Sequence, residues 1–362
     1  MHNSGAVFLK PLTIGFMVLT FSSVVLAQHY TQTNLVSNVP GAASVTDPNL
    51  QNAWGLVAGP ATPWWVADNH AGFSTLYDGA GNILSLVVTI PSASGNGTTG
   101  SPTGIVFNGS PTDFLVNGNP EKFIFVTEDG TLSAWNGGTS AVIVKNNARD
   151  NAVYKGATIG QIDGKKYLFV TNFHSGHVEV YDTYFKRVPI SEERFDDDQL
   201  PEGFAPFNIQ GIGPNLYVTY AKQDAAKHDD VHGAGLGYVD VYSPRGFRLA
   251  RLEHGSWFNG PWGIVLAPAN FGEFSHTVLV GNFGDGTIAA FNPVTGRFLR
   301  RMRTPEGSVL KIDGLWALRF GNGSNSGPAN TLFFTAGPNA EMDGLFGTLR
   351  PIPSELNEGD EQ

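Results

Sequence analysis

Six stretches of the sequence share one pattern, a short apolar run followed by a turn, and in four of them an Asp, Glu or Asn that could bind a metal stands at the same place. They are WWVADNHAG, FIFVTEDG, LFVTNFHSG, LYVTYAKQD, VLVGNFGDG and LFFTAGPN. When the six runs are aligned on one apolar residue, a second position lies two residues further along the chain. Side chains alternate along a strand, so the residues at this position should all face the same way. They are Asp68, Glu128, Asn172, Tyr220, Asn282 and Ala336. The oxygens of Asp68, Glu128, Asn172 and Asn282 predict a divalent-cation site, above all for Ca²⁺. The alternative is that these residues only make turns.

Histidines lie close to these positions. In VTNFHSGHVEVYD (170–182), His174 takes the turn position that His70 takes in the first stretch, and His177 begins the next alternating run. A histidine in such a turn could act as a general base, so His174 is a candidate for proton transfer. The alternative is a solvated turn residue, which we expect His177 to be.

The fourth stretch runs into a long polar segment, AKQDAAKHDDVHGAGLG (221–237). Such a segment is usually a lid over a site or a disordered excursion, and its Asp224 is a second candidate for proton transfer. His228 and His232 have the spacing of helical zinc ligands. However, the sequence lacks HExxH, and the glycines that follow argue against a helix.

A second set of related phrases precedes the first: NAWGLV, SPTGIVF, YKGATIG, APFNIQ, GPWGIVL and GLWALRF. Aligned, they place Trp54, Thr103, Lys155, Phe207, Trp262 and Trp316 at equivalent positions, at intervals of 49, 52, 52, 55 and 54 residues. The aromatic members, Trp54, Phe207, Trp262 and Trp316, could stack on a sugar or an aromatic substrate, or could only fill space between repeats. Lys155 is the third candidate for proton transfer.

These phrases belong to six repeated units of about 50 residues. A third, alternating phrase follows in most units, for example HVEVYD and YVDVYS, and the 45 glycines suit short strands joined by tight turns. Three to four short strands per unit predict an all-β fold, the six-bladed β-propeller. In a propeller blade, the innermost strand begins on the same face of the disc on which the second strand ends. Both sets of candidate residues should therefore meet at one mouth of the central channel.

The ends of the repeat region predict how the ring closes. The sixth unit lacks a fourth strand, and an unplaced strand-like run, HYTQTNLVS (29–37), lies near the other end of the chain. Pairing this run with the last blade would remove an exposed sheet edge. We therefore expect one propeller domain over residues 28–352 and a flexible acidic tail over residues 353–362.

The composition of the chain and its first 27 residues limit the classes of function that the protein could have. Residues 1–27 have one lysine, an apolar run and a small-residue cleavage pattern, which predict a signal peptide and a secreted or periplasmic protein. The net charge of −10 opposes binding to nucleic acid or to an anionic membrane. The chain has no cysteine, which excludes disulfides and thiol catalysis. We expect a monomer.

With these motifs assembled, the chain resembles a family of exported six-bladed propeller proteins of uncharacterised function. The resemblance runs over about residues 34–350 and rests on motifs that include PTGIVFNG, FVTEDG, APFNIQGIG, PWGIVLAPANFG and IDGLWALRFGNG. A looser resemblance is to NHL-repeat and gluconolactonase-like propellers. In the latter, Glu, Asp and Asn at the channel hold a divalent cation for lactone hydrolysis, which implies that role for Asp68, Glu128, Asn172 and Asn282. The NHL-type amidating lyases instead use channel histidines with zinc.

Two functional hypotheses follow. In the first, the protein is a metal-dependent hydrolase or lyase that acts on a lactone, a sugar or an aromatic small molecule, with the cation polarising a carbonyl or activating a water. His174, Lys155 or Asp224 would transfer protons. In the second, the same face binds a glycan or a protein without catalysis, since a fold does not decide a function.

Overall fold

The computed structural model describes residues 1–2, 28–191 and 194–353. All but residues 1–2 of the predicted signal peptide (1–27) and all but residue 353 of the predicted acidic tail (353–362) lie outside this description. Within the described ranges, no helix has the length and apolarity that a membrane crossing requires.

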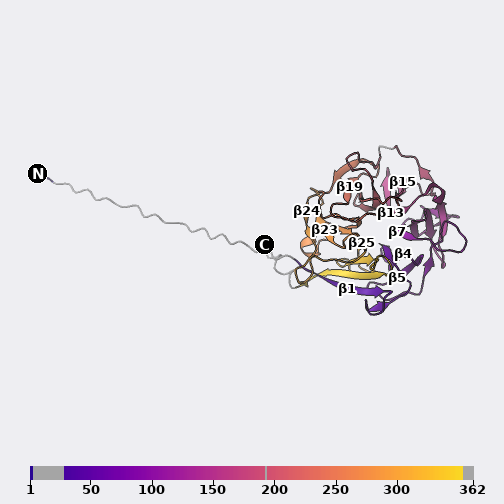
Figure 1. Ribbon diagram of the computed structural model, residues 1–362, viewed down its shortest axis with the longest axis horizontal. Helices are drawn as coiled ribbons and strands as arrows, with labels where there is room; N and C mark the ends of the chain where they lie inside the picture. The colour runs from indigo at the N-terminus through magenta and orange to yellow at the C-terminus, as the bar shows by residue number, and fades with distance from the viewer. Residues whose placement is uncertain (3–27, 192–193, 354–362) are drawn as a thin grey trace.

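Six sheets are arranged around a central axis, which confirms the six-bladed β-propeller (Figure 1). Among the described residues, five of these sheets have four strands and the sixth has five, and the inner strands are β3, β7, β13, β17, β21 and β25. The inner strands contact one another in sequence around the ring, and the last contacts the first. Apolar side chains of neighbouring blades form the core between them.

The blades follow chain order. Blade one is β3 (Ala53–Val57), β4 (Trp64–Asp68), β5 (Phe73–Tyr77) and β6 (Val88–Thr89). Blade two is β7 (Pro102–Phe107), β10 (Phe123–Thr127), β11 (Thr131–Trp135) and β12 (Val142–Asn146), with a hairpin of β8 (Leu115–Val116) and β9 (Asn119–Pro120) inserted. Blade three is β13 (Tyr154–Ile162), β14 (Lys165–Asn172), β15 (His177–Tyr181) and β16 (Arg187–Val188).

The second half repeats the arrangement. Blade four is β17 (Phe204–Ile212), β18 (Asn215–Lys222), β19 (Tyr238–Tyr242) and β20 (Arg248–Arg251). Blade five is β21 (Pro261–Leu266), β22 (Val278–Asn282), β23 (Ile288–Phe291) and β24 (Phe298–Arg301). Blade six is β25 (Leu315–Phe320), β26 (Leu332–Ala336), β27 (Leu345–Pro351), β1 (Tyr30–Ser37) and β2 (Val45–Thr46). Two short 3₁₀ turns, η1 (Ala148–Asp150) and η2 (Gly272–Phe274), lie between strands.

The ring closes as predicted, through the strand near the start of the chain. β1 pairs antiparallel with β27, from Tyr30 opposite Pro351 to Ser37 opposite Leu345 (Figure 1). The buried Tyr30 ring stacks on Phe274, and its hydroxyl donates to the carbonyl of Phe271 at 2.9 Å. β1 therefore covers the open edge of blade six and ties that blade to blade five.

Every inner strand has a β-bulge near its start. In each blade the pairing with the second strand shifts by one residue at the same place, for example between Tyr154 and Gly156 in blade three. The predicted ring of Trp54, Thr103, Lys155, Phe207, Trp262 and Trp316 falls at these six bulges. A bulge bends the strand and re-aims a side chain. This geometry explains why the aligned residues share one direction although their side chains differ.

Candidate functional site

Four aromatic residues at the bulges pack together across the channel, and we call this layer the aromatic floor. They are Trp54, Phe207, Trp262 and Trp316. Trp54 stacks on Trp316 with ring centroids 3.6 Å apart, and Trp262 meets the two rings edge-on at 6.3 and 6.0 Å. Phe207 lies 6.0 Å from Trp316. These four predicted substrate-binding residues are thus brought together, but none is more than 4% exposed. Their packing matches the space-filling alternative.

Lys155 places a charge in this aromatic floor. It is 1% exposed, and its Nζ lies 2.5 Å from Oε1 of Glu128, 3.4 Å from Oδ1 of Asp229 and 5.0 Å from the ring centroid of Trp54. Burial by itself lowers the pKa of Lys155, but the carboxylates of Glu128 and Asp229 outweigh it and hold the pKa above its ordinary value. Lys155 is therefore a fixed positive charge and not a proton acceptor near neutral pH.

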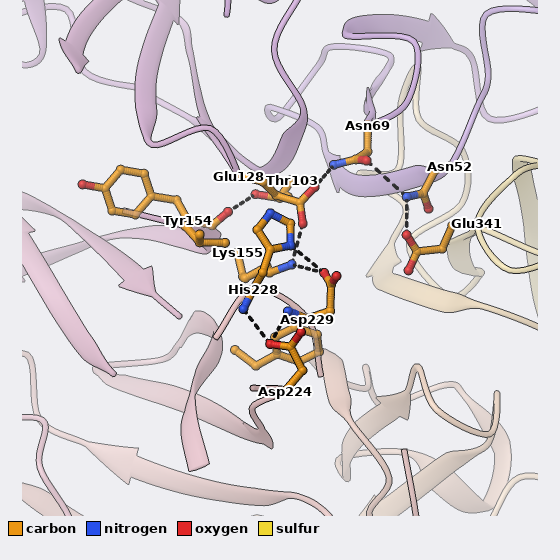
Figure 2. Close-up of polar contacts among 12 residues, drawn as sticks. Asn52, Asn69, Thr103, Glu128, Tyr154, Lys155, Asp224, His228, Asp229 and Glu341 are labelled. Carbon is orange, nitrogen blue, oxygen red and sulfur yellow. Dashed lines mark hydrogen bonds and ion pairs between the residues drawn. The ribbon is translucent and has the colours of Figure 1, made fainter. Parts of the chain in front are cut away.

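A chain of hydrogen bonds runs from Glu128 around the mouth to blade six (Figure 2). Nδ2 of Asn69 donates to Oε2 of Glu128 at 2.8 Å. Nδ2 of Asn52 then reaches Oδ1 of Asn69 at 3.3 Å and Oε2 of Glu341 at 3.1 Å. Oδ1 of Asn52 accepts from the indole of Trp316 at 2.9 Å, so the chain is anchored in the floor.

Segment 221–237 lies over this mouth and contacts Lys155 of blade three and Phe173 in the turn after β14. Gln223 bridges to Asp230, and its side chain donates to the carbonyl of Phe173 in blade three at 2.5 Å. Oδ1 of Asp224 accepts the backbone N–H groups of His228 at 2.9 Å and of Asp229 at 3.3 Å. The carboxylate of Asp224 therefore shapes the loop turn that presents His228 and Asp229 (Figure 2).

Glu128, His228 and Asp229 form a group that could hold a metal ion. One ligand atom from each lies within 4.8 Å of the others. The side chain of Glu128 is 12% exposed, whereas those of His228 and Asp229 are 45% and 67% exposed, so the group opens to solvent on the loop side. Nδ1 of His228 lies 2.9 Å from Oδ1 of Asp229. This contact lowers the pKa of Asp229 to about 2 and raises the pKa of His228.

The strand register corrects the alignment of the predicted oxygen ring in blade two. Asp68 pairs with Ala53 and Asn172 with Tyr154, but in blade two the residue that pairs with the equivalent position, Pro102, is Thr127. Glu128 follows Thr127, and a shift of one residue reverses the direction of a side chain. The side chain of Glu128 therefore does not point in the direction shared by Asp68 and Asn172. The turn after β10 is one residue shorter than in blades one and three, which misled the alignment.

The other three residues of that ring are engaged within their own blades. Oδ2 of Asp68 accepts the N–H of Thr75 at 2.9 Å. Oδ1 of Asn172 accepts the N–H of Ser175 at 3.2 Å, and Oδ1 of Asn282 accepts the N–H of Asn259 at 3.0 Å. Burial raises the pKa of Asp68 well above its ordinary value. These contacts correspond to the turn-making alternative.

The remaining candidates lie apart from the metal-binding group. His174 is a partly exposed turn residue after β14, and it is not a member of the group formed by Glu128, His228 and Asp229. The residues that the sequence reasoning missed are Asn52, Asn69, Asp229 and Glu341. Asn69 and Glu128 occupy equivalent positions directly after a second strand. Correct counting from the apolar runs would have revealed this position; no comparable signal identified Glu341.

Comparisons with known proteins relate the whole propeller to other chains. No family model matches the sequence. The uncharacterised protein R648 of Acanthamoeba polyphaga mimivirus is 31% identical over 328 residues, which cover 87% of this chain and 78% of that protein. The uncharacterised protein L690 of the same virus is 31% identical over 327 residues, covering 87% and 84%.

Among solved structures, a streptogramin B lyase superimposes with a TM-score of 0.53 at 10% identity, covering 90% of this chain and 98% of the lyase. A glucose dehydrogenase superimposes with a TM-score of 0.52 at 10% identity, covering 88% and 98%. At this level of identity the likeness concerns the fold alone.

Proposed function

The chain belongs to one protein family with the uncharacterised mimivirus proteins R648 and L690, and we propose that its channel mouth binds a divalent metal ion that assists hydrolysis or elimination in a small organic molecule. The observation that carries this proposal is the convergence of Glu128, His228 and Asp229, whose ligand atoms lie within 4.8 Å of one another. They come from two blades that are not adjacent, so only the folded ring unites them.

The charges at the mouth support a cation. Glu128 and Asp229 converge there, and Asp230 and Glu341 are close enough to act on the same charged groups. Lys155 already sits between the first two carboxylates, which marks a place where positive charge is favoured. Glu128, Asp229 and Asp230 exceed the buried ammonium in charge, and that excess favours a further cation once His228 has released its proton to become a ligand.

The ligand types favour one class of metal over another. Ca²⁺ binds oxygen ligands, whereas the imidazole of His228 suits Zn²⁺, Mn²⁺ and related ions that accept nitrogen. We therefore propose such an ion in place of the expected Ca²⁺. Three protein ligands leave coordination positions open on the exposed side, where a water or a substrate carbonyl could bind.

The chain itself would supply positioning and charge. A bound metal would polarise a carbonyl or activate a water. Lys155 would hold Glu128 in place and stabilise negative charge that develops on the substrate, since its ammonium stays protonated. The aromatic floor of Trp54, Trp262 and Trp316 would exclude water from below. A lactone, a sugar or an aromatic ester fits this chemistry, and the expected signal peptide would place the reaction outside the cytoplasm.

The burial of the tryptophans disfavours the alternative of a glycan-binding module. Stacking on a sugar needs an exposed ring face, and these rings are at most 4% exposed. The metal proposal does not need them to touch a ligand.

Metal binding is tested by calorimetry and elemental analysis on chelator-treated protein titrated with Zn²⁺, Mn²⁺ or Ca²⁺. We expect one ion per chain, and a loss of affinity of at least tenfold in Glu128→Gln, His228→Ala and Asp229→Asn. The matched controls are His177→Ala and Asp198→Asn, both at exposed positions, which should bind as the wild type does. Binding with no fixed stoichiometry, or equal losses in the controls, would reject the site.

Catalysis needs its own measurement. A panel of lactones and esters is assayed with the preferred metal and with chelator, on the wild type and on His228→Ala. Turnover that disappears both with chelator and in the variant supports the enzyme. One tightly bound ion without any turnover would leave a binding protein instead.

A further inference from the structure

The inner strands form a second, chemically different mouth at their other ends. A cavity of about 520 Å³ lies there. Residues near the ends of all six inner strands line it: Val57, Phe107, Ile159, Gln210, Leu266 and Arg319. Arg319 is three residues beyond Trp316 and Ile159 is four beyond Lys155, so roughly 10–13 Å of strand separates this cavity from the bulge residues Trp316 and Lys155. The aromatic floor lies between the two mouths.

Arg319 brings a poorly compensated charge to this cavity. Its Nε donates to the carbonyl of Leu56 at 3.3 Å, its Nη1 to the carbonyl of Ile264 at 3.4 Å, and its Nη2 to Oε1 of Gln210. All three acceptors are neutral. Within the part of the chain that the structure describes, no carboxylate forms an ion pair with Arg319. Burial accordingly lowers the pKa of Arg319 to about 10.

The guanidinium of Arg319 would be stabilised by a bound anion. A guanidinium has about five N–H donors, and the three contacts leave roughly two that can face a ligand. Two such donors match the two oxygens of a carboxylate. Among the described residues that line the cavity, none is acidic, so an incoming carboxylate would meet no like charge there. Burying a charge without a counter-charge is unfavourable, and a bound anion removes that penalty.

The remaining walls favour an apolar body on the ligand. Trp64, Ile105, Phe107, Val265 and Phe320 line the cavity together with Ile159 and Leu266, and Thr158, Gln210 and Asn322 add uncharged polar groups to the walls. Its volume is in the range of small-molecule sites, which combine apolar walls with a few placed polar groups. Among the described residues that line the cavity, Arg319 is the one charged side chain, which suits a ligand with a single negative charge. A phosphate, which carries more charge and no apolar body, fits less well.

We propose that this second mouth binds a small organic carboxylate, with the carboxylate on Arg319 and an apolar chain or ring against Phe107, Ile159 and Leu266. The site stands independently of the metal centre, because it uses the opposite ends of the inner strands. It adds a ligand class that the acidic mouth would repel.

Calorimetry with octanoate, octanamide and inorganic phosphate tests the proposal, with tryptophan fluorescence as a second signal because Trp64 lines the cavity. Octanoate should bind one per chain, and octanamide and phosphate at least tenfold more weakly. Octanamide binding as tightly as octanoate would overturn the role of Arg319. Phosphate binding as tightly as octanoate would overturn the role of the apolar walls, and absence of octanoate binding would overturn the site.

Variants separate binding from folding. Arg319→Met should weaken octanoate binding at least tenfold, whereas Arg245→Met, at an exposed arginine paired with Asp163, should not. Since Arg319 of blade six also contacts blades one, four and five, Gly211→Leu gives a second measurement. A Cβ at Gly211 meets only Thr158 Oγ1 at 3.5 Å and Ile159 O at 3.8 Å, so the added side chain should occupy the cavity without backbone conflict. Unchanged octanoate affinity in Gly211→Leu would reject the proposal even if Arg319→Met failed to fold.

Discussion

Nζ of Lys155 in blade three lies 2.5 Å from Oε1 of Glu128, which belongs to the neighbouring blade two. Lys155 occupies the bulge of β13, and Glu128 directly follows β10. Their side chains are only 1% and 12% exposed, so water screens the pair weakly. This ion pair sets the charge of the mouth and also joins blade two to blade three.

Removing the ammonium should destabilise the protein strongly. We expect Lys155→Met to lower the free energy of unfolding by about 3–5 kcal/mol, because Glu128 is left without a counter-charge. The double variant with Glu128→Gln should recover about 1–3 kcal/mol of that loss. Urea unfolding measures both. Lys166→Met, which breaks a partly exposed pair with Asp113 at 3.8 Å, should lose under about 1 kcal/mol. Strict additivity of the two substitutions would contradict the coupling.

The glycine after the bulge residue is required by close approach between inner strands. A Cβ on Gly55 would lie 2.2 Å from the carbonyl oxygen of Thr103 in the next blade. We expect Gly55→Ala to lower the free energy of unfolding by roughly 3 kcal/mol or to prevent folding, since backbone atoms cannot yield there. Gly137→Ala, where a Cβ meets nothing within 4 Å, should stay within about 0.5 kcal/mol of the wild type. Thermal unfolding of Gly55→Ala and Gly137→Ala measures this difference, and equal unfolding midpoints for the two variants would refute the packing argument.

Ring closure can be locked covalently because the chain has no cysteine of its own. Thr31 of β1 is directly opposite Arg350 of β27, and both positions are exposed. The double variant Thr31→Cys with Arg350→Cys should form a disulfide and gain about 2–5 kcal/mol, since the bond closes a very long loop. The gain should vanish under reducing agent, and Thr31→Cys alone should show none. Failure to cross-link would place β1 elsewhere than beside β27.

Glu341 should make stability depend on pH. Burial, followed by the charge of Glu128, raises the pKa of Glu341 from 4.5 to about 7. Below about pH 4.5 the carboxyl is protonated in both states. Between pH 4.5 and 7 the unfolded chain loses this proton first, so the stability contribution declines with rising pH and is lost above about 7.

Glu341→Gln should therefore gain roughly 1–3 kcal/mol relative to the wild type as the pH rises from 5 to 8. Chemical unfolding of both proteins at each pH gives the difference. Parallel pH profiles would show that Glu341 does not carry this effect.

The sequence alone was sufficient for the architecture. The apolar runs and the recurring phrases around Trp54, Trp262 and Trp316 predicted six blades and an inner ring of aligned residues. The run 29–37 predicted the closing strand. These features are local and repeated, so the period of the chain reveals them without knowledge of any contact between blades.

The tertiary structure decided the site. A turn one residue shorter in blade two moves Glu128 out of the expected ring and toward Lys155, because one residue reverses the direction of a side chain on a strand. Loop 221–237 then brings His228 and Asp229 to Glu128 from a blade that is not adjacent in the ring. Arg319 likewise meets Leu56, Ile264 and Gln210 only across the closed ring. Contacts between side chains of different blades leave no periodic trace in the sequence, so only the folded ring determines them.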